Sequence, residues 1–327
     1  MKKFVNDIDD ILTESLSGFA LAHADLVTLH LEPNVVTRKN KAKNKVAIIS
    51  GGGSGHEPLH TGYVGQGMLD AACPGYVFTS PSPDQMLAAA EMVQADKGVL
   101  FIVKNYAGDV MNFEMAAEML PFESATVLVS DDVAVENSTY TTGQRGVAGT
   151  LIVEKCIGAL AESGASLADC KRLGDKVNSQ TASMGVALSS CTVPAAGKPT
   201  FELAENELEM GVGIHGEPGR ERQAMRSADE IVAEIVSAIL MDLKIEKNSE
   251  ILLLVNGFGA TPQMELYVLF NSAAIVLQAA GLKIERSLVG NYVTALDMAG
   301  ASITVCLLDA EIKALWDAPV HTAALRW

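Results

Sequence analysis

Five short apolar segments, each closed or followed by Gly, Asn or Asp, restrict the fold of this chain more than any other feature. They are KVAIIS, GVLFIVKN, ATVLVS, EILLLVN and SITVCLLD. Continuous apolar runs of this length, rich in β-branched residues, are typical of strands covered on both faces. Helical patterns lie between them, over residues 82–95, 144–164 and 227–243. The alternation predicts an α/β fold with parallel or mixed sheets.

The chain is long enough for two α/β domains, and its composition suggests where they divide. Residues 184–199 combine small side chains with two glycines and two prolines, which is typical of a connection. We therefore expect an N-terminal α/β domain over residues 1–185 and a C-terminal α/β domain over residues 186–327. Ligands of such folds bind beyond the carboxyl ends of strands. The loops that follow the strands are thus expected to carry the chemistry.

Charge and hydropathy exclude several functional classes. The 40 acidic residues outnumber the 24 basic ones and give a formal net charge of −16, which repels nucleic acids and anionic membranes. No apolar stretch reaches the roughly 20 residues of a membrane span, and the N-terminus lacks the apolar core of a signal peptide. The five cysteines are scattered without a C-x-x-C pair. We therefore expect a cytoplasmic chain with buried free cysteines, no metal site and no nucleic-acid or membrane partner.

The segment SGGGSGHEPLH, residues 50–60, resembles several known loops. A Walker loop requires a lysine, and none occurs between Lys45 and Lys97. The dinucleotide pattern G-x-G-x-x-G fails because His56 takes the last glycine position. Zinc proteases hold the two histidines of H-E-x-x-H within one helix. Here Pro58 lies between His56 and His60 and would break such a helix, which argues against a zinc site.

The remaining interpretation is a glycine loop whose backbone approaches a small polar ligand, with His56 at its rim. His56 is therefore either structural or catalytic. His60, like His23 and His30, has no supporting neighbours in the sequence and is expected to be a surface or packing residue.

Asp109 and His215 are the other candidates for a site. Asp109 follows the strand segment that ends at Lys104 and Asn105, where it is either a site residue or the cap of the next helix. His215 lies among four glycines in EMGVGIHGEPG, so its imidazole is sterically open, as a nucleophile requires. A tight turn would explain the same glycines.

A set of motifs resembles the dihydroxyacetone kinase K subunit. They are GGGSGHEP, FTSPSPDQ, VKNYAGDVMNFE, DDVAVE, RGVAGTLIVEK, CTVPAAGKP, EMGVGIHGEPG and WDAPVHTAALRW. They occur in the family's order and extend over nearly the whole chain. The resemblance implies a homodimer of the K-domain fold, with two α/β domains, that binds dihydroxyacetone.

The resemblance also implies roles for individual residues. His215 matches the histidine that attacks the ketone and forms a covalent hemiaminal. His56 and Asp109 match the acid/base candidates of phosphoryl transfer, and either could take the proton. The substrate-binding positions of the family fall on Gly53, Ser54, Gly55, His56, Lys104 and Asp109. A ketone can form such an adduct, whereas glycerol has no electrophilic carbon.

Partners follow from the same resemblance. In this family ADP or ATP and magnesium bind a separate L domain, which the resemblance implies is a partner L subunit here. We expect the bacterial three-component arrangement, in which an M subunit of the phosphotransferase system recharges the nucleotide; a separate L partner that uses ATP is the alternative. The resemblance thus implies a phosphotransferase with glycerone kinase activity, with phosphoenolpyruvate as the ultimate donor and no cofactor on this chain. The alternative is a dihydroxyacetone-sensing paralogue that acts as co-activator of a transcription factor.

Overall fold

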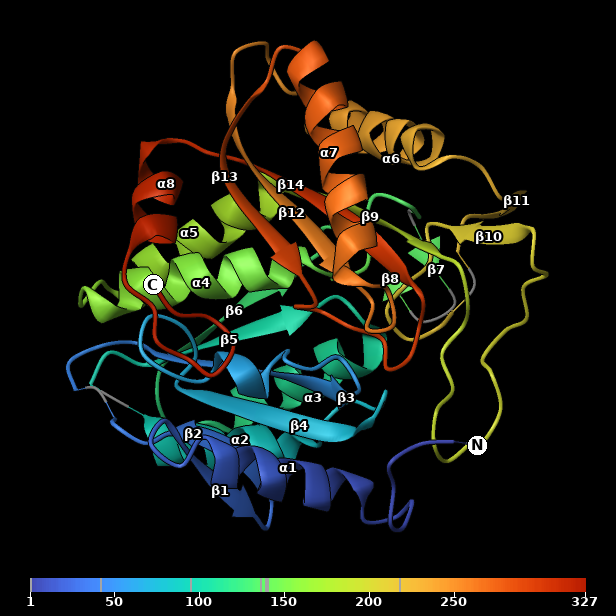
Figure 1. The fold of residues 1–327 in the computed structure, drawn as a ribbon. Coiled ribbons are helices and arrows are strands. Elements are labelled where there is room, and N and C mark those ends of the chain that lie inside the picture. The colour runs from blue at the N-terminus through green and yellow to red at the C-terminus, as the bar shows by residue number, and fades with distance from the viewer. Residues whose placement is uncertain (1, 42, 95, 136, 139–140, 218) are drawn as a thin grey trace.

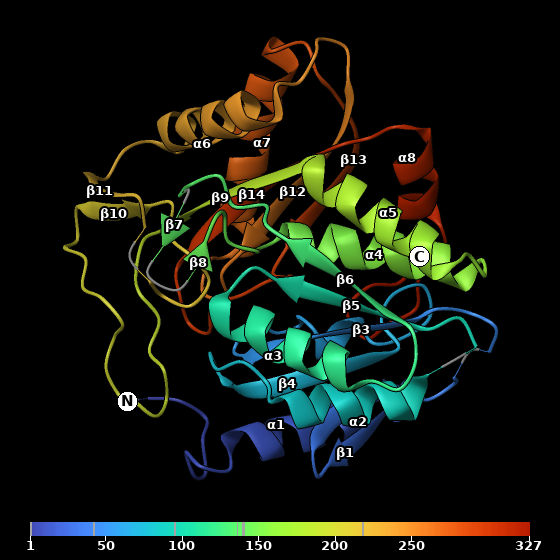
Figure 2. The same ribbon diagram turned by 180° about the vertical axis from the view of Figure 1, so that it is seen from behind.

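The protein is built in five alternating layers of helices and sheets (Figure 1, Figure 2). The structure, a computed structural model, describes residues 2–41, 43–94, 96–135, 137–138, 141–217 and 219–327. Two six-stranded sheets enclose a central layer of helices, and each sheet carries further helices on its outer face. This arrangement confirms the predicted α/β fold with mixed sheets.

The first sheet has a parallel centre and an antiparallel edge. In spatial order its strands are β1 (Val27–Leu31), β2 (Asn34–Arg38), β4 (Ala71–Val77), β3 (Ala47–Ser54), β5 (Val99–Lys104) and β6 (Ser124–Val129). Strands β4, β3, β5 and β6 run parallel, so their carboxyl ends meet at one edge of the sheet.

The second sheet is mostly antiparallel, with β12 and β13 as its parallel pair. Its spatial order is β11 (Glu221–Ala224), β10 (Glu207–Met210), β9 (Thr181–Ala187), β14 (Gly300–Leu307), β12 (Glu250–Gly257) and β13 (Lys283–Gly290). The short strands β7 (Asn137–Ser138) and β8 (Thr141–Thr142) pair separately. Residue 185 lies within β9, and a division of the chain into domains at that position stays a prediction.

The helices occupy three layers. The central layer holds α4 (Gly149–Glu162), α5 (Leu167–Ser179) and α8 (Ala310–Asp317), and α1 (Ile11–Ala22) packs on the same face of the first sheet, beside β1. The outer helices are α2 (Pro83–Val93), α3 (Ala107–Met119), α6 (Ala228–Leu243) and α7 (Gln263–Ala279). A 3-10 turn, η1, covers Thr61–Tyr63. None of the helices within the described ranges is long and apolar enough to cross a membrane.

The three predicted helices are present, with shorter ends. Helix α6 begins after Ser227 with the predicted capping box, in which the Ser227 hydroxyl and the Glu230 carboxylate each accept a backbone N–H. Helix α4 begins only at Gly149, because Asp131 accepts the N–H groups of Val147 and Gly149 and holds that turn outside the helix. Helix α2 ends at Val93, and the predicted end of that helix, Ala95, lies outside the described residues.

Alternation along the strands divides the interior into three cores. In β12, Leu252 and Leu254 face the central helices, whereas Ile251, Leu253 and Val255 face α6 and α7. The first sheet alternates likewise between the central core and a third core beneath α2 and α3. Each sheet is therefore covered on both faces, as the continuous apolar runs require.

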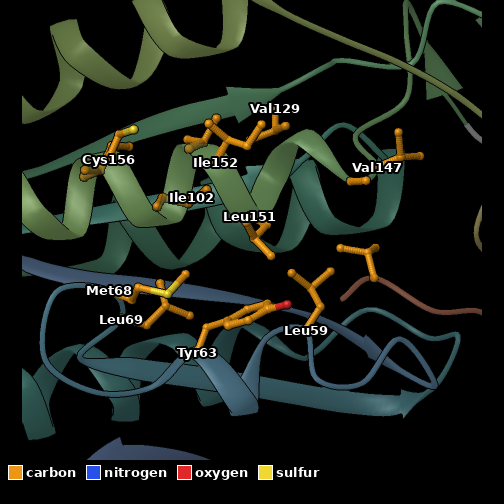
Figure 3. Close-up of a cluster of buried hydrophobic side chains, with 14 of the residues drawn as sticks. Leu59, Tyr63, Met68, Leu69, Ile102, Val129, Val147, Leu151, Ile152 and Cys156 are labelled. Carbon is orange, nitrogen blue, oxygen red and sulfur yellow. The ribbon is translucent and has the colours of Figure 1, made fainter. Parts of the chain in front are cut away.

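Helix α4 is the most deeply buried helix of the central layer. Every residue from Gly149 to Ala159 is buried. Side chains such as Leu151 and Ile152 share a hydrophobic core with Tyr63 of η1 and Ile102 of β5 (Figure 3). A helix that contacts neighbours all round carries apolar residues on every face. Polar residues in such a helix need a specific partner.

Gly158 tests how closely α4 packs. A Cβ at Gly158 would lie 2.7 Å from the carbonyl oxygen of Gly67 and collide with the backbone of Met68. We expect Gly158→Ala to lower the free energy of unfolding by about 1–3 kcal/mol through overpacking, measured by urea denaturation. The matched control is Gly18→Ala in α1, where a Cβ meets nothing within 4 Å and helix propensity favours alanine. Equal effects of the two substitutions would contradict the close contact.

Candidate active site

The glycine-rich segment is part of a strand, not the loop expected from the sequence. Strand β3 continues through Gly51, Gly52 and Gly53 to Ser54. A Cβ at Gly53 would lie 2.7 Å from the Cα of Phe78, and one at Gly52 would collide with Nζ of Lys104. These glycines therefore allow close approach of a lysine and a neighbouring backbone, whereas the predicted approach to a small polar ligand stays a prediction.

His56 follows this strand and is completely buried. Its Nδ1 lies 2.8 Å from the carbonyl oxygen of Thr294, in the loop between β13 and β14. A carbonyl can only accept, so Nδ1 carries the proton and Nε2 carries a lone pair. That Nε2 has no hydrogen-bond partner among the described residues. The ring stacks on Phe78, with centroids 5.0 Å apart.

His215 reaches the same place from the loop that follows β10. Its ring stands edge-on to His56 at a centroid distance of 4.7 Å and to Tyr106 at 4.4 Å. The structure thus brings together two histidines that lie far apart in the sequence. His215 is partly exposed, whereas Tyr106 and His56 are buried.

A buried arginine holds the loop of His215. The Glu217 carboxylate accepts the backbone N–H of His215 at 2.9 Å and faces Nη1 of Arg145 at 3.4 Å. Arg145 also donates to the Gly211 carbonyl and to Asp132. Glu57 accepts the N–H of Gly55 in a similar way. The sequences His56-Glu57-Pro58 and His215-Gly216-Glu217 thus lie in two loops that each have an internal carboxylate acceptor.

Both imidazoles are held in the neutral form. Burial is the largest cause that lowers the pKa of His56 well below its usual value, followed by His215 and Lys104; the Thr294 carbonyl opposes the shift. Burial, then Lys104 and Arg145, lowers the pKa of His215 to about 3. A neutral imidazole has a lone pair for attack or for proton abstraction.

Asp109 lies in the first turn of α3 and does not cap it. The helix begins at Ala107 after Tyr106, so the N-cap interpretation of Asp109 is wrong. Its Oδ2 lies 4.0 Å from Nζ of Lys104, and its Oδ1 has no partner among the described residues. Burial raises the pKa of Asp109 against the opposing effects of Lys104 and Ser80. The raised pKa suits a proton acceptor near neutral pH.

Three buried polar atoms without a partner in the described protein therefore surround this site. They are Nε2 of His56, Oδ1 of Asp109 and the hydroxyl oxygen of Tyr106. Buried polar atoms are nearly always hydrogen-bonded in native proteins. Their unused capacity suits a small molecule with several hydroxyl or carbonyl groups. Among the described residues there is no group of three His, Cys, Asp or Glu side chains placed to hold a metal ion.

The sequence-predicted residues do not all behave alike. Ser54 uses its hydroxyl to donate to the Gly75 carbonyl, so its predicted contact with substrate stays a prediction. His60, expected to be a surface or packing residue, is buried. It also has polar partners that its sequence neighbours did not indicate. All five cysteines are buried and free, as expected.

Sequence reasoning did not identify Phe78, Tyr106, Arg145 or Thr294 as parts of the site. Phe78 and Tyr106 stand within the quoted motifs, but apolar and aromatic residues beside a strand are normally core residues. Thr294 acts through its backbone, so its side-chain chemistry gave no signal.

Comparison with known proteins identifies the family of this chain. The Dak1 domain family matches residues 17–324. The chain belongs to the Dak1 family. It is 50% identical over 355 aligned positions to the PEP-dependent dihydroxyacetone kinase, dihydroxyacetone-binding subunit DhaK, of Escherichia coli, with 100% of this chain and 99% of the relative covered. It is 48% identical to a PTS-dependent DhaK subunit of Listeria innocua, with 95% of each chain covered. The resemblance to the K subunits is therefore confirmed.

Solved Dak1 structures share the fold. The dihydroxyacetone kinase operon co-activator DhaQ superimposes with a TM-score of 0.90 at 34% identity, covering 95% of this chain and 97% of that one. The dihydroxyacetone kinase of C. freundii gives a TM-score of 0.88 at 33% identity, covering 99% of this chain and 60% of that one.

The neutral state of His215 in this Dak1 chain predicts a loss of stability in acid. An exposed histidine in the unfolded chain has a pKa of about 6.5, whereas the folded protein lowers the pKa of His215 to about 3. Between these values the unfolded state binds more protons, so the free energy of unfolding falls as the pH decreases. We expect the free energy of unfolding, measured by urea denaturation, to decrease less between about pH 7 and about pH 5 for His215→Asn than for wild type. Equal decreases would contradict the lowered pKa.

Proposed function

We propose that this chain is the dihydroxyacetone-binding subunit of a phosphoenolpyruvate-dependent dihydroxyacetone kinase. It holds the ketone as a covalent hemiaminal on His215 while a terminal hydroxyl is phosphorylated. Full-length identity of 50% to a DhaK subunit supports the substrate class. The observation that carries the mechanism is the edge-on contact of two neutral imidazoles, His56 and His215, beside Oδ1 of Asp109 and the Tyr106 hydroxyl, which have no hydrogen-bond partner among the described residues.

The covalent step uses the lone pair of neutral His215. A ring nitrogen attacks the carbonyl carbon, and the π electrons of C=O move to the oxygen. The oxygen gains one proton and the imidazole loses one from its other nitrogen, so the hemiaminal is neutral. The tether holds a small, weakly bound substrate in place and converts the next step into an effectively unimolecular one.

The phosphoryl step needs an acceptor for the proton of the terminal hydroxyl. Nε2 of His56 is suited because Thr294 fixes the proton on Nδ1. Oδ1 of Asp109 is suited because burial raises its pKa. Removal of the proton would allow the hydroxyl oxygen to bond to the terminal phosphorus of a nucleoside triphosphate, while the bond from that phosphorus to the departing nucleoside diphosphate breaks. Gly53, Gly55 and Lys104 complete the proposed contacts with substrate.

The nucleotide belongs to another chain in this proposal. ADP or ATP and magnesium bind a separate L subunit, an M subunit recharges the nucleotide, and this chain acts as a homodimer in the cytoplasm. Support comes from the relatives, which are named as subunits of PEP- or PTS-dependent kinases.

A second function, dihydroxyacetone sensing by a co-activator, is favoured by the TM-score of 0.90 to DhaQ. The higher identity to kinase subunits, 50% against 34%, supports the kinase.

The adduct can be observed directly by NMR. With dihydroxyacetone labelled with carbon-13 at its carbonyl, wild type is expected to shift this resonance from the carbonyl range to that of a tetrahedral carbon. His215→Ala is expected to show only the signals of the free carbonyl and of the hydrate, because no imidazole attacks the ketone. Asp109→Asn serves as a control that retains the nucleophile. A bound tetrahedral signal in His215→Ala would refute the assignment of the nucleophile.

Turnover distinguishes the kinase from the sensor. We expect phosphorylation of dihydroxyacetone with phosphoenolpyruvate to require this chain together with L and M subunits. Asp109→Asn is expected to lower kcat by at least about 100-fold, the usual contribution of a general acid or base. A coupled assay of product formation measures both effects. Adduct formation by wild type without any turnover would favour the sensor instead.

A further inference from the structure

A carboxyl group lies in the middle of the most buried helix. Glu154, on α4, is completely buried among residues that are otherwise mostly apolar. Its Oε1 lies 2.6 Å from Nδ1 of His60, and its Oε2 has no partner among the described residues. A buried carboxyl costs free energy unless it is paired. Its presence in α4 therefore calls for a function beyond packing.

His60 connects this carboxyl to the active site. Its Nε2 lies 2.7 Å from Nζ of Lys104, and its Nδ1 also lies 3.0 Å from the Ser50 hydroxyl. That hydroxyl donates to the Ile102 carbonyl at 2.7 Å. The chain of contacts runs from α4 through the segment after β3 to the end of β5.

The direction of these hydrogen bonds follows from their donors. An ammonium group has only N–H donors, so Nε2 of His60 accepts from Lys104 and Nδ1 carries the proton. That proton points to Oε1 of Glu154. Burial raises the pKa of Glu154 to about 8, yet Oε1 accepts whether the carboxyl is ionised or carries its proton on Oε2.

Lys104 depends on these neighbours because it is completely buried. Its Nζ makes a long contact of 3.4 Å to the Gly51 carbonyl and stands 4.0 Å from Asp109. Among the described residues, the contact with His60 is thus the shortest polar contact of Lys104. Burial lowers the pKa of Lys104, with Asp109 and Glu154 opposing.

We propose that Glu154 and His60 are positioning residues that aim the Lys104 ammonium into the active site. Glu154 fixes the proton of His60 on Nδ1, and the lone pair on Nε2 then anchors one N–H of Lys104. The remaining N–H groups stay directed toward Asp109 and the bound molecule. This inference rests on the proposed function only where it assigns Lys104 to the substrate.

Paired substitutions separate the hydrogen bonds from packing. His60→Gln keeps an acceptor for Lys104, whereas His60→Phe fills the space without one. Glu154→Gln keeps an oxygen for the Nδ1 proton, whereas Glu154→Met does not. Glu162→Met is the matched control, because Glu162 lies on the same helix and pairs instead with Arg38 and Lys45.

The first measurement needs no substrate. A correlation between Hζ and nitrogen-15 Nζ of Lys104, assigned through Lys104→Met, is expected in wild type because hydrogen bonding and burial slow proton exchange. His60→Gln, Glu154→Gln and the Glu162→Met control are expected to retain the signal, and His60→Phe and Glu154→Met to lose it. Retention of the signal in folded His60→Phe would overturn the inference, whether or not the chain binds dihydroxyacetone.

The second measurement is the affinity for dihydroxyacetone, determined by calorimetry. His60→Phe and Glu154→Met are expected to weaken binding about tenfold, as for loss of a hydrogen bond to a charged group, with little change in the two conservative variants and in Glu162→Met. In the Lys104→Met background, His60→Phe is expected to cause no further loss. If His60→Phe weakened binding equally in wild type and in Lys104→Met, His60 would act through packing alone, and the inference would be wrong. Failure of wild type to bind would refute the proposed function and leave the NMR result to decide the inference.

Discussion

Burial of helix α4 between the two sheets is the constraint on which the rest of the molecule depends. Because α4 contacts both sheets, it fixes the strand ends of the first against the loops of the second. His56 follows β3, whereas the carbonyl that determines its tautomer belongs to Thr294 and its ring partner is His215. The site therefore depends on central packing far more than on any single loop.

Burial also explains the chemistry of the site. Removal from water is the largest cause that lowers the pKa of His56 and His215 and raises that of Asp109. The same environment that stabilises the core thus leaves two imidazoles neutral and a carboxyl more basic. Close approach at Gly52 places Lys104 beside them. Core packing and reactivity share one physical origin here.

The sequence predicted the parts of the protein whose signals are local. Apolar runs identified the buried strands, and the capping box located the start of α6. His215, His56 and Asp109 were selected as candidates by residue type and motif, and only the family resemblance implied that they meet at one substrate. The residues themselves do not show this, because it depends on how two sheets pack. Asp109 was open to misinterpretation as a cap because it lies in the first turn of α3, close to the true N-cap residue, Tyr106. His60 gave no signal because its partners, Lys104 and Glu154, are remote in sequence.

The hydrogen bond from His56 to Thr294 has a consequence for how this protein is divided or recombined. The backbone of residues 294–296 also pairs with Gly55 and His56 through two further hydrogen bonds. A fragment that ends before β13 would keep the motif GGGSGHEP intact and lose the acceptor that orients its histidine. Its imidazole would be free to exchange tautomers in solvent, as in a short peptide. The basic nitrogen of His56 is thus a property of the assembled chain, and transfer of the motif to another scaffold would carry the residue without its chemistry.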